Sequence, residues 1–390
     1  MRLLHISSMV DLATGGPAEG LRNFCATYAS FGYEVEVVSL DDPQVVASQN
    51  FPAPLYPMGP GRGVFGFTPK MIPWLRANLH RFDLVLINGV WNYNTMAAAF
   101  VLSRSDKPYA IFTHGMLDPY FKRAFPLKHI KKSLYWHLIL ARFFNRANAV
   151  FFTSEEEKIL ARQSFGNYHV REQVVPYGTY GPNCYLTAAK AKFLARFPEL
   201  GGKRLALFLS RIHPKKGTDL LVEAFARTLG KDPDWQLVLA GPDQIGWQAE
   251  LTEKARQLGA AERITWTGML KDELKWGAFA AAECFVLPSH QENFGIVVAE
   301  ALSCNLPVIT TDKVNIWREI KAANAGFIGS DTLDDTLRLL DQWQHLSAAE
   351  RDAMRQQARK CFDENFYYQT TRNRIAEIYQ RLLSEPLERR

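Results

Sequence analysis

One stretch of the sequence combines a polar turn with a helix-like run: Ser289-His-Gln-Glu-Asn-Phe-Gly-Ile-Val-Val-Ala-Glu-Ala-Leu-Ser303. It follows an apolar run, Cys284-Phe-Val-Leu-Pro288, which is typical of a buried strand, and its second half is rich in strong helix formers. The pattern predicts a strand, a polar turn and a helix that begins near Phe294-Gly295. In a parallel α/β sheet, the free N–H groups and the dipole of such a helix start attract an anion. We therefore expect a ligand site at this turn.

Two acids bracket the expected helix start. Glu292 and Glu300 are eight positions apart, and carboxylates are poor neighbours for an anion unless they accept hydrogen bonds from hydroxyl groups. A nucleotide sugar has both kinds of group, because its diphosphate suits the amides and its ribose and hexose hydroxyls suit the carboxylates. The alternative interpretation is a pair of solvated acids on an ordinary surface helix.

Two cations lie in a second turn, Arg211-Ile-His-Pro-Lys-Lys216-Gly217, which follows the apolar run 205–209. A sharp turn would let Arg211 and Lys216 point at one spot. Sugar transfer from a nucleotide develops negative charge on the departing diphosphate, and fixed cations stabilise that charge most strongly in the transition state. The alternative is a basic surface turn, and Lys215 is interpreted as a solvated neighbour.

Three further candidates follow strand-like runs in the first half of the chain. Gly15-Gly16 comes after the first run; two glycines allow positive φ angles and a close approach to a bulky ligand, although a plain turn has the same pattern. His114 follows Ile111-Phe-Thr and is either a hydrogen-bonded structural residue or a ligand contact. Asp118 precedes Pro119, which favours a turn-former over a base or an acceptor contact.

Together these motifs resemble the signature of retaining glycosyltransferase family four, the glycosyl transferases group 1, which has the GT-B fold. The resemblance rests on the two acids with Phe-Gly between them, on the Arg211–Lys216 turn and on Gly15-Gly16, and it spans the whole chain. It implies two Rossmann-like doubly wound parallel-sheet domains that face a central cleft. It also implies that a hexose leaves a nucleotide diphosphate sugar with retention of its anomeric configuration.

The resemblance implies roles for particular residues. Four would act at the reacting carbon or at the diphosphate: His114, Arg211, Lys216 and Glu292. Eight would bind the donor: Gly15, Gly16, Met269, Asn293, Phe294, Gly295, Ile296 and Glu300. Among these, Glu300 would hold the ribose hydroxyls, and the backbone around Met269 would contact the base, which is uridine or guanosine.

Strand-like and helix-like segments alternate along both halves of the chain, which predicts doubly wound parallel sheets. The expected strands are 3–6, 34–38, 84–87, 109–112 and 149–152, then 205–209, 236–239, 264–266, 285–287 and 307–310. The Pro- and Gly-rich region 41–73 is expected to be irregular. A chain of 390 residues fits two domains. We predict an N-terminal acceptor-binding domain at 1–185, a C-terminal nucleotide-sugar-binding domain at 186–365 and a helix crossing back to the first domain at 366–390.

Composition narrows the class of protein. With 47% hydrophobic and 22% charged residues, the chain resembles an ordinary globular protein. No apolar run approaches about 18 residues, so we expect no transmembrane helix, and the first residues are interpreted as a strand rather than a signal peptide. The five cysteines are scattered without metal-ligand spacing, so we expect a reduced cytoplasmic setting and no metal cofactor. No expected strand is followed by a dinucleotide-binding or Walker-type glycine motif, which disfavours a dehydrogenase and a P-loop kinase.

A stretch without Asp or Glu runs from Pro119 to Ser154. Its cations are Lys122, Arg123, Lys128, Lys131, Lys132, Arg142 and Arg146, and aromatic residues are interleaved with them. This composition indicates an anionic membrane surface or nucleic acid, and nothing else in the chain supports nucleic acid. Four apolar residues of this stretch follow helical spacing: Leu127, Ile130, Leu134 and Leu138. Their spacing predicts that part of the stretch packs on its own domain. The alternative to membrane contact is therefore a packed helix with a solvated basic face. The expected membrane contacts are Lys122, Arg123, Lys128, Lys131 and Lys132.

The sequence thus predicts a metal-independent hexosyltransferase that uses a UDP- or GDP-sugar. Its expected acceptor is a lipid-linked intermediate of bacterial surface polysaccharide biosynthesis, and its expected location is the inner face of the cytoplasmic membrane. Two alternatives stay open: a transferase or synthase with a small soluble acceptor, and a catalytically silent protein that binds a sugar nucleotide or a glycan. The first would show no lipid dependence, and the second would release no nucleoside diphosphate.

Overall fold

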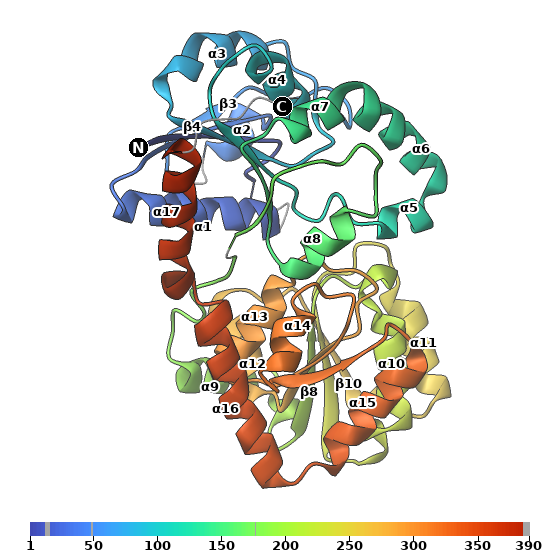
Figure 1. The fold of residues 1–390 in the computed structure, drawn as a ribbon. Coiled ribbons are helices and arrows are strands. Elements are labelled where there is room, and N and C mark those ends of the chain that lie inside the picture. The colour runs from blue at the N-terminus through green and yellow to red at the C-terminus, as the bar shows by residue number, and fades with distance from the viewer. Residues whose placement is uncertain (12–15, 48–49, 176, 385–390) are drawn as a thin grey trace. The chain divides into compact units, whose positions relative to one another are not determined.

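The computed structural model describes residues 1–11, 16–47, 50–175 and 177–384 (Figure 1). The chain divides into two compact units. The first contains Met1–Tyr177 together with Arg372–Arg390, and the second contains Gly178–Thr371. Each unit is built around one parallel sheet.

Seven parallel strands form the sheet of the first unit, in the order β3-β2-β1-β4-β5-β6-β7. They are β1 (Arg2–Ser7), β2 (Glu34–Ser39), β3 (Leu55–Pro57), β4 (Leu84–Asn88), β5 (Tyr109–Phe112), β6 (Ala149–Phe152) and β7 (Glu172–Val174). The strand order changes direction between β1 and β4. In a doubly wound sheet, ligands bind at the carboxyl ends of the two strands that flank such a switch point.

The helices of the first unit connect these strands. They are α1 (Gly16–Ser30), α2 (Pro43–Val46), α3 (Met71–Asn78), η2 (Leu79–Arg81), α4 (Tyr93–Leu102), α5 (Tyr120–Ala124), α6 (Pro126–Tyr135), α7 (Ala141–Asn145) and α8 (Glu155–Ala161). A π-helical turn, η3 (Trp136–Leu140), joins α6 to α7. The last helix is α17 (Tyr368–Ser384). It packs on α1, where the hydroxyl oxygens of Tyr28 and Tyr379 lie 2.6 Å apart and are buried.

Six parallel strands form the sheet of the second unit, in the order β10-β9-β8-β11-β12-β13. They are β8 (Arg204–Leu209), β9 (Trp235–Ala240), β10 (Ile264–Gly268), β11 (Cys284–Leu287), β12 (Val308–Thr311) and β13 (Gly326–Gly329). Every residue of β9 and β11 is buried, as expected for strands with helices on both faces of the sheet. The switch point of this sheet lies between β8 and β11.

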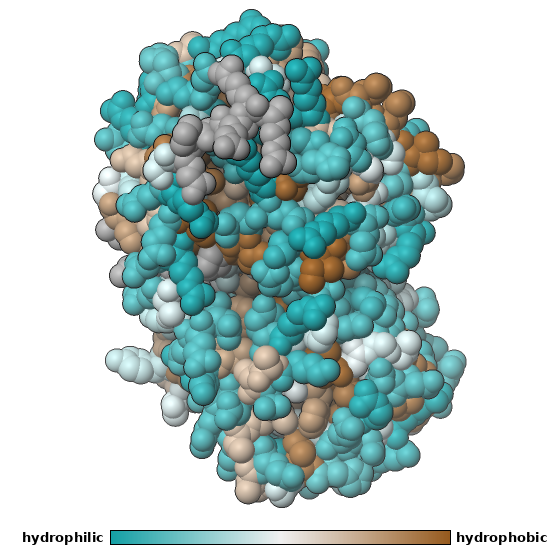
Figure 2. Space-filling model, viewed as in Figure 1, coloured by the Kyte–Doolittle hydropathy of each residue, from teal (hydrophilic) through white to brown (hydrophobic). Residues whose placement is uncertain are grey.

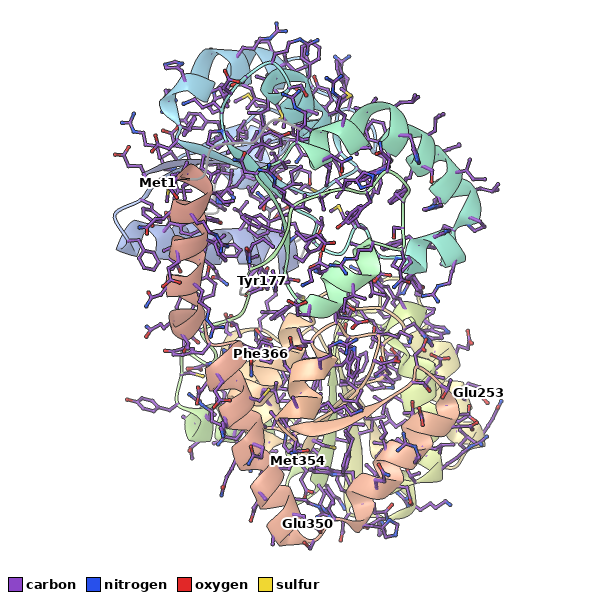
Figure 3. All side chains as sticks on the ribbon, viewed as in Figure 1. Met1, Tyr177, Glu253, Glu350, Met354 and Phe366 are labelled. Atoms are coloured by element: carbon purple, nitrogen blue, oxygen red, sulfur yellow. The ribbon has the colours of Figure 1, made fainter. Side chains whose placement is uncertain are left out.

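The helices of the second unit alternate with its strands. They are α9 (Leu186–Arg196), η4 (Pro198–Leu200), η5 (Pro214–Lys216), α10 (Thr218–Arg227), η6 (Leu229–Lys231), α11 (Gln248–Gln257), η7 (Ala261–Arg263), α12 (Asp272–Ala281), α13 (Ile296–Ser303), α14 (Trp317–Ala322), α15 (Leu333–His345) and α16 (Ala348–Asn365). Ser347 and Glu350 form a capping box that starts α16, and Phe366 follows its last residue (Figure 3). Two doubly wound parallel sheets thus confirm the predicted fold class.

Three strands that the sequence does not predict lie at sheet edges: β3, β7 and β13. The expectation that 41–73 is irregular is wrong, because this region contains α2, β3 and the start of α3. β3 pairs with β2 alone, and an edge strand tolerates Pro57 because only one of its sides needs N–H donors. The glycine-rich segment after β3 forms a turn that is closed by backbone hydrogen bonds between Arg62 and Phe67.

Part of the acid-free stretch packs on its own domain, as predicted, but not through the four apolar residues that the helical spacing identifies. The exposed fractions are 77, 65, 62 and 73% for Leu127, Ile130, Leu134 and Leu138. Figure 2 shows the corresponding hydrophobic surface over α6. The segment is instead anchored in the core by Trp136, Leu140, Phe143 and Phe144, which are buried. Helical spacing identifies an apolar face but not what covers it, and here the large aromatic residues take the buried side.

Candidate active site

The turn after β8 is fixed by its own backbone. His213 Nδ1 accepts a hydrogen bond from Lys215 N at 3.1 Å, and the short helix η5 follows. Gly217 adopts a left-handed conformation with φ 66°, and a Cβ at this position would lie 2.0 Å from the Pro288 carbonyl oxygen. Glycine is required here for both reasons, and it lets the turn pack against the loop after β11.

The loop after β11 is tied to its two neighbours. Lys215 O, in the turn after β8, accepts hydrogen bonds from Ser289 Oγ at 3.0 Å and from His290 N at 2.9 Å. On the other side, Glu292 N donates to Lys313 O, in the loop after β12, at 2.9 Å. Backbone hydrogen bonds therefore hold the three loops together at the carboxyl edge of the sheet, beside the switch point.

Lys216 and Glu292 form an ion pair between two of these loops. Lys216 Nζ donates to Glu292 Oε2, and the lysine side chain is buried. Burial of the ammonium, together with Lys215 and Arg211, lowers the pKa of Lys216 to about 7. The Glu292 carboxylate acts in the opposite direction, because a nearby anion favours the charged amine. The pair thus places an anion beside a lysine whose charged form is disfavoured by burial.

Arg211 and Lys216, which the sequence predicts to point at one spot, have different hydrogen-bond partners. The Arg211 side chain is exposed, and Nη1 donates to Gln244 Oε1 at 3.3 Å. Lys216 points instead to Glu292, so the two cations have different partners. Their assignment as diphosphate contacts stays a prediction.

Glu300 lies in the second turn of α13 and forms a second ion pair. Its Oε1 accepts a hydrogen bond from Lys275 Nζ of α12 at 2.7 Å, and the carboxylate is almost fully buried. Lys275 Nζ also lies 4.4 Å from the ring centroid of Trp276. Sequence analysis missed Lys275, because no motif surrounds it and its partner is 25 positions away.

The start of α13 presents backbone rather than side chains. Gly295 has φ 74°, and the helix begins at Ile296. The Phe294 ring is buried edge-on against Phe366, with centroids 5.7 Å apart, so this residue offers a ligand its backbone. Asn293 precedes it and is half-buried. Met269 directly follows β10 at the same edge of the sheet and is exposed.

At the carboxyl edge of the first sheet, three polar side chains form a chain across neighbouring strands. His114 follows β5, and its Nε2 lies 3.2 Å from Asn88 Oδ1 at the end of β4. Asn88 Nδ2 lies 3.2 Å from His5 Nδ1 in β1. Burial lowers the pKa of His114 to about 4 and that of His5 to about 3, so both imidazoles are neutral at neutral pH. Sequence analysis missed His5 and Asn88, whose only signal is a polar side chain inside a buried strand.

Glu157 holds the loop that carries His114. Its buried carboxylate accepts hydrogen bonds from Gly115 N and Thr113 Oγ1, both at 2.6 Å, through Oε1. Through Oε2 it accepts from Thr153 N at 2.7 Å and from Thr153 Oγ1 at 2.8 Å. The loop needs this support because His114 has φ 47°, a left-handed conformation that is uncommon for a residue other than glycine. Sequence analysis also missed Glu157.

The other candidates in the first unit are placed as follows. Gly15 lies outside the described residues, and Gly16 is the first residue of α1. Asp118 is buried, and its Oδ1 accepts a hydrogen bond from Tyr120 N at 2.7 Å, which makes an Asx turn at the start of α5. Its possible contact with an acceptor stays a prediction.

Across the part of the chain that the structure describes, no group of three or more His, Cys, Asp or Glu side chains is arranged to hold a metal ion. Asp232-Pro-Asp234, an Asp-x-Asp sequence, forms an Asx turn before the amino end of β9, and Asp234 N donates to Asp232 Oδ1 at 2.9 Å. Within the same described ranges, no helix is long and apolar enough to cross a membrane.

Two doubly wound parallel sheets are the architecture of the GT-B glycosyltransferases, and the family models assign the chain to this class. The model of the family "Glycosyl transferases group 1" matches residues 190–361, and that of the "Glycosyl transferase 4-like domain" matches 15–178. Together the two matches account for most of both units. The chain belongs to the group 1 family of glycosyl transferases.

Curated relatives match part of the chain. It is 31% identical over 189 residues to the D-inositol 3-phosphate glycosyltransferase of Nocardia farcinica, a match that covers 47% of this chain and 42% of that protein. It is 27% identical over 192 residues to the lipopolysaccharide core biosynthesis mannosyltransferase LpsB of Rhizobium meliloti, covering 46% and 52%. The chain thus spans about half the length of these curated relatives.

Solved structures resemble the whole chain. HepE of Anabaena, in complex with UDP and glucose, has a TM-score of 0.77 at 18% identity and covers 98% of this chain and 100% of its own. The sucrose-phosphate synthase of Thermosynechococcus elongatus has a TM-score of 0.76 at 16% identity with the same coverage. At such low identities the likeness establishes the fold alone.

Proposed function

We propose that the protein transfers a hexose from a UDP- or GDP-sugar to a glycan acceptor with retention of anomeric configuration. The observation that carries the proposal is the Lys216–Glu292 pair at the switch point of the second sheet. A buried cation and the N–H groups at the start of α13 suit a diphosphate, whereas Glu292 and Glu300 suit sugar hydroxyls. Membership of the group 1 family supports the same assignment.

In this proposal Lys216 changes partner when the donor binds. Glu292 holds the ammonium charged and in place beforehand, so little reorganisation is needed when a phosphate oxygen replaces the carboxylate. Glu292 then accepts a hydrogen bond from a hexose hydroxyl. As the bond to the sugar breaks, the charge on the departing diphosphate grows, and a fixed cation stabilises it more than it stabilises the bound donor. We propose that this arrangement works without a metal ion.

We further propose a lipid-linked acceptor and attachment to an anionic membrane through α6. The exposed apolar residues of α6 and η3 lie in a stretch that has no acid from Pro119 to Ser154. An anionic bilayer complements this charge, each cation near it contributing about 1 kcal/mol. Four apolar side chains would each add roughly 1.5–3 kcal/mol if they were fully buried in the bilayer. The relative LpsB, a lipopolysaccharide core biosynthesis mannosyltransferase, supports such an acceptor.

Donor turnover tests the transferase proposal directly. The full chain is incubated with UDP-glucose, UDP-galactose or GDP-mannose, and the release of UDP or GDP is measured with and without vesicles that contain extracted lipid-linked glycans. Release above background with one donor is the expected result. No release from any donor would favour a silent binding protein, and release that is stimulated only by soluble sugars or sugar phosphates would favour a small acceptor.

Vesicle sedimentation tests the membrane proposal. The protein should pellet with vesicles that contain anionic phosphatidylglycerol, less with neutral phosphatidylcholine, and less as salt concentration rises. Leu127→Ser with Leu134→Ser should release it without unfolding it, because both side chains are already exposed. Val64→Ser, which removes a fully exposed apolar side chain outside α6, is the matched control. Equal pelleting with both lipids, or none, would contradict the proposal.

A further inference from the structure

The first unit contains a pocket of about 230 Å³ that the proposed donor chemistry does not use. The loop after β4 contributes Trp91, and the loop after β5 contributes Asp118. Phe121 comes from α5, and Lys128 and Lys132 come from α6. The pocket is therefore lined in part by the same loop of the first sheet that carries the candidate His114.

Lys128 and Lys132 bring two ammonium groups to this pocket. They are one helical turn apart and so share a face of α6. Lys132 Nζ lies 4.6 Å from the ring centroid of Trp91, and Lys128 Nζ lies 5.1 Å from that of Phe125. Among the residues that the structure describes, neither ammonium forms an ion pair. Burial and the charge of Lys128 lower the pKa of Lys132, which indicates that the protein compensates its charge only in part.

The other titratable groups of the pocket leave its charge positive. The Asp118 carboxylate accepts the hydrogen bond from Tyr120 N and contributes one negative charge to the lining. The His129 ring stacks on Phe165 at 4.8 Å. Burial, followed by the charges of Lys122 and Lys132, lowers the pKa of His129, so its imidazole is neutral at neutral pH. The lining thus has two cations against one anion.

The remaining walls are aromatic and held in place. Trp91 Nε1 donates to Met116 O at 3.1 Å, and the Trp91 ring lies 5.3 Å from Phe165. Phe121 and Phe125 complete the apolar lining. An uncharged sugar would leave the net positive charge of the lining without an anion, and two lysines disfavour a metal cation. A compact anion that carries an apolar group fits both features of the pocket.

We infer that this pocket binds a phosphate ester of an apolar chain, with the phosphate at Lys128 and Lys132 and the adjoining carbons against the aromatic walls. The inference rests on the proposed function, because it assigns the pocket to the phosphate that joins the acceptor glycan to its lipid. The inference also assigns different roles to the two faces of α6. The lysines of one face hold the phosphate, and the exposed leucines of the other face meet the bilayer.

Calorimetric titration of the full chain, without vesicles, tests the inference. Hexyl phosphate should bind more tightly than inorganic phosphate and much more tightly than 1-hexanol. Lys132→Gln and Lys128→Gln should each weaken hexyl phosphate binding by roughly tenfold, the scale for losing one charge-assisted hydrogen bond. Lys132→Arg should retain binding. Lys131→Gln is the matched control, because this neighbour on α6 is exposed and does not line the pocket. Circular dichroism of each variant establishes that it is folded.

Each outcome has a meaning. Unchanged affinity in folded Lys132→Gln, or equal affinity for 1-hexanol, would overturn the inference. If inorganic phosphate bound as tightly as hexyl phosphate, the proposed contact with an apolar chain would be wrong, and the pocket would be assigned to a free phosphate. Donor turnover is measured on the same preparations. Turnover without hexyl phosphate binding overturns the pocket alone, whereas binding without turnover of any donor overturns the proposed function and leaves a phosphate-ester site.

Discussion

The loops after β8 and β11 and the loops after β1 and β4 occupy corresponding places in the two sheets, since each set flanks a switch point. Their chemistry differs. The edge of the second sheet has two ion pairs, Lys216–Glu292 and Lys275–Glu300, each with one buried partner. The edge of the first has neutral imidazoles joined through Asn88. Topology thus places a site, whereas side chains decide its charge, and among the residues that the structure describes the ionic edge has the cations that suit a diphosphate.

The largest effect is expected when a cation is removed from the ionic edge. Lys216→Ala should lower kcat by roughly 10²–10³, the scale for one preorganised charge stabiliser. The departing diphosphate loses a cation, and Glu292 loses its partner. Arg211→Ala should lower kcat by a factor in the same range. Nucleoside diphosphate release measures both. Lys215→Ala is the control, because it retains the backbone carbonyl that holds the loop after β11, and near-normal turnover in Lys216→Ala would mean that the diphosphate site is misplaced.

At the carboxyl edge of the first sheet, where the imidazoles are neutral, we expect an effect from loss of the hydrogen bonds to Glu157 rather than from loss of a charge at the ligand site. Glu157→Gln replaces an acceptor oxygen with an NH2 group that faces hydrogen-bond donors, so we expect the free energy of unfolding to fall by about 2 kcal/mol. Because the loop that carries His114 loosens, kcat should fall as well. Urea denaturation and donor turnover measure the two effects. Glu155→Gln, an exposed neighbour, should change neither; a stable, fully active Glu157→Gln would show that the loop needs no such support.

A smaller effect is expected at the second ion pair. Glu300→Ala should raise KM for the donor roughly tenfold with little change in kcat, because a ribose contact is made equally in the bound donor and the transition state. A double variant, Glu300→Ala with Lys275→Met, distinguishes a ribose contact from a role in which Glu300 only neutralises Lys275. If Glu300 served only to neutralise Lys275, the double variant would recover the wild-type KM. An unchanged KM in Glu300→Ala would exclude the ribose contact.

The neutral edge also predicts a pH dependence of stability. Between pH 6.5 and about 4, the unfolded chain protonates its histidines while folded His114 stays neutral, so the unfolded state binds more protons. The free energy of unfolding should therefore fall as the pH drops through this window, and His5 should extend the fall to about pH 3. His114→Asn should flatten the profile, because Asn tolerates a positive φ and does not titrate. Parallel profiles for the two proteins would contradict the assignment.

The smallest effect is expected from a chelator. If cations and a helix start at the ionic edge stabilise the diphosphate, EDTA should leave donor turnover unchanged. Complete loss of turnover that magnesium or manganese restores would assign a carboxylate site to metal binding and reduce the part played by Lys216.

Much of this protein was determined by its sequence alone. Alternation of apolar runs with helical spacing predicts every central strand of both sheets, because strands covered on both faces must be apolar throughout. The unpredicted strands β3, β7 and β13 are edges, where pairing on one side suffices and the apolar signal is weak. The motifs around Lys216, Glu292 and Glu300 also follow from local sequence, because strand, turn and helix are adjacent along the chain.

Only the tertiary structure decided which charges meet. Lys216 and Glu292 are 76 positions apart, and Glu157 lies 42 positions from the glycine that it holds, so no local pattern records these contacts. The same limit applies to α6, whose spacing identifies an apolar face. Packing of Trp136 and Phe144 turned that face outward and turned Lys132 toward a pocket. Sequence periodicity describes one element at a time, whereas burial depends on the elements that pack around it.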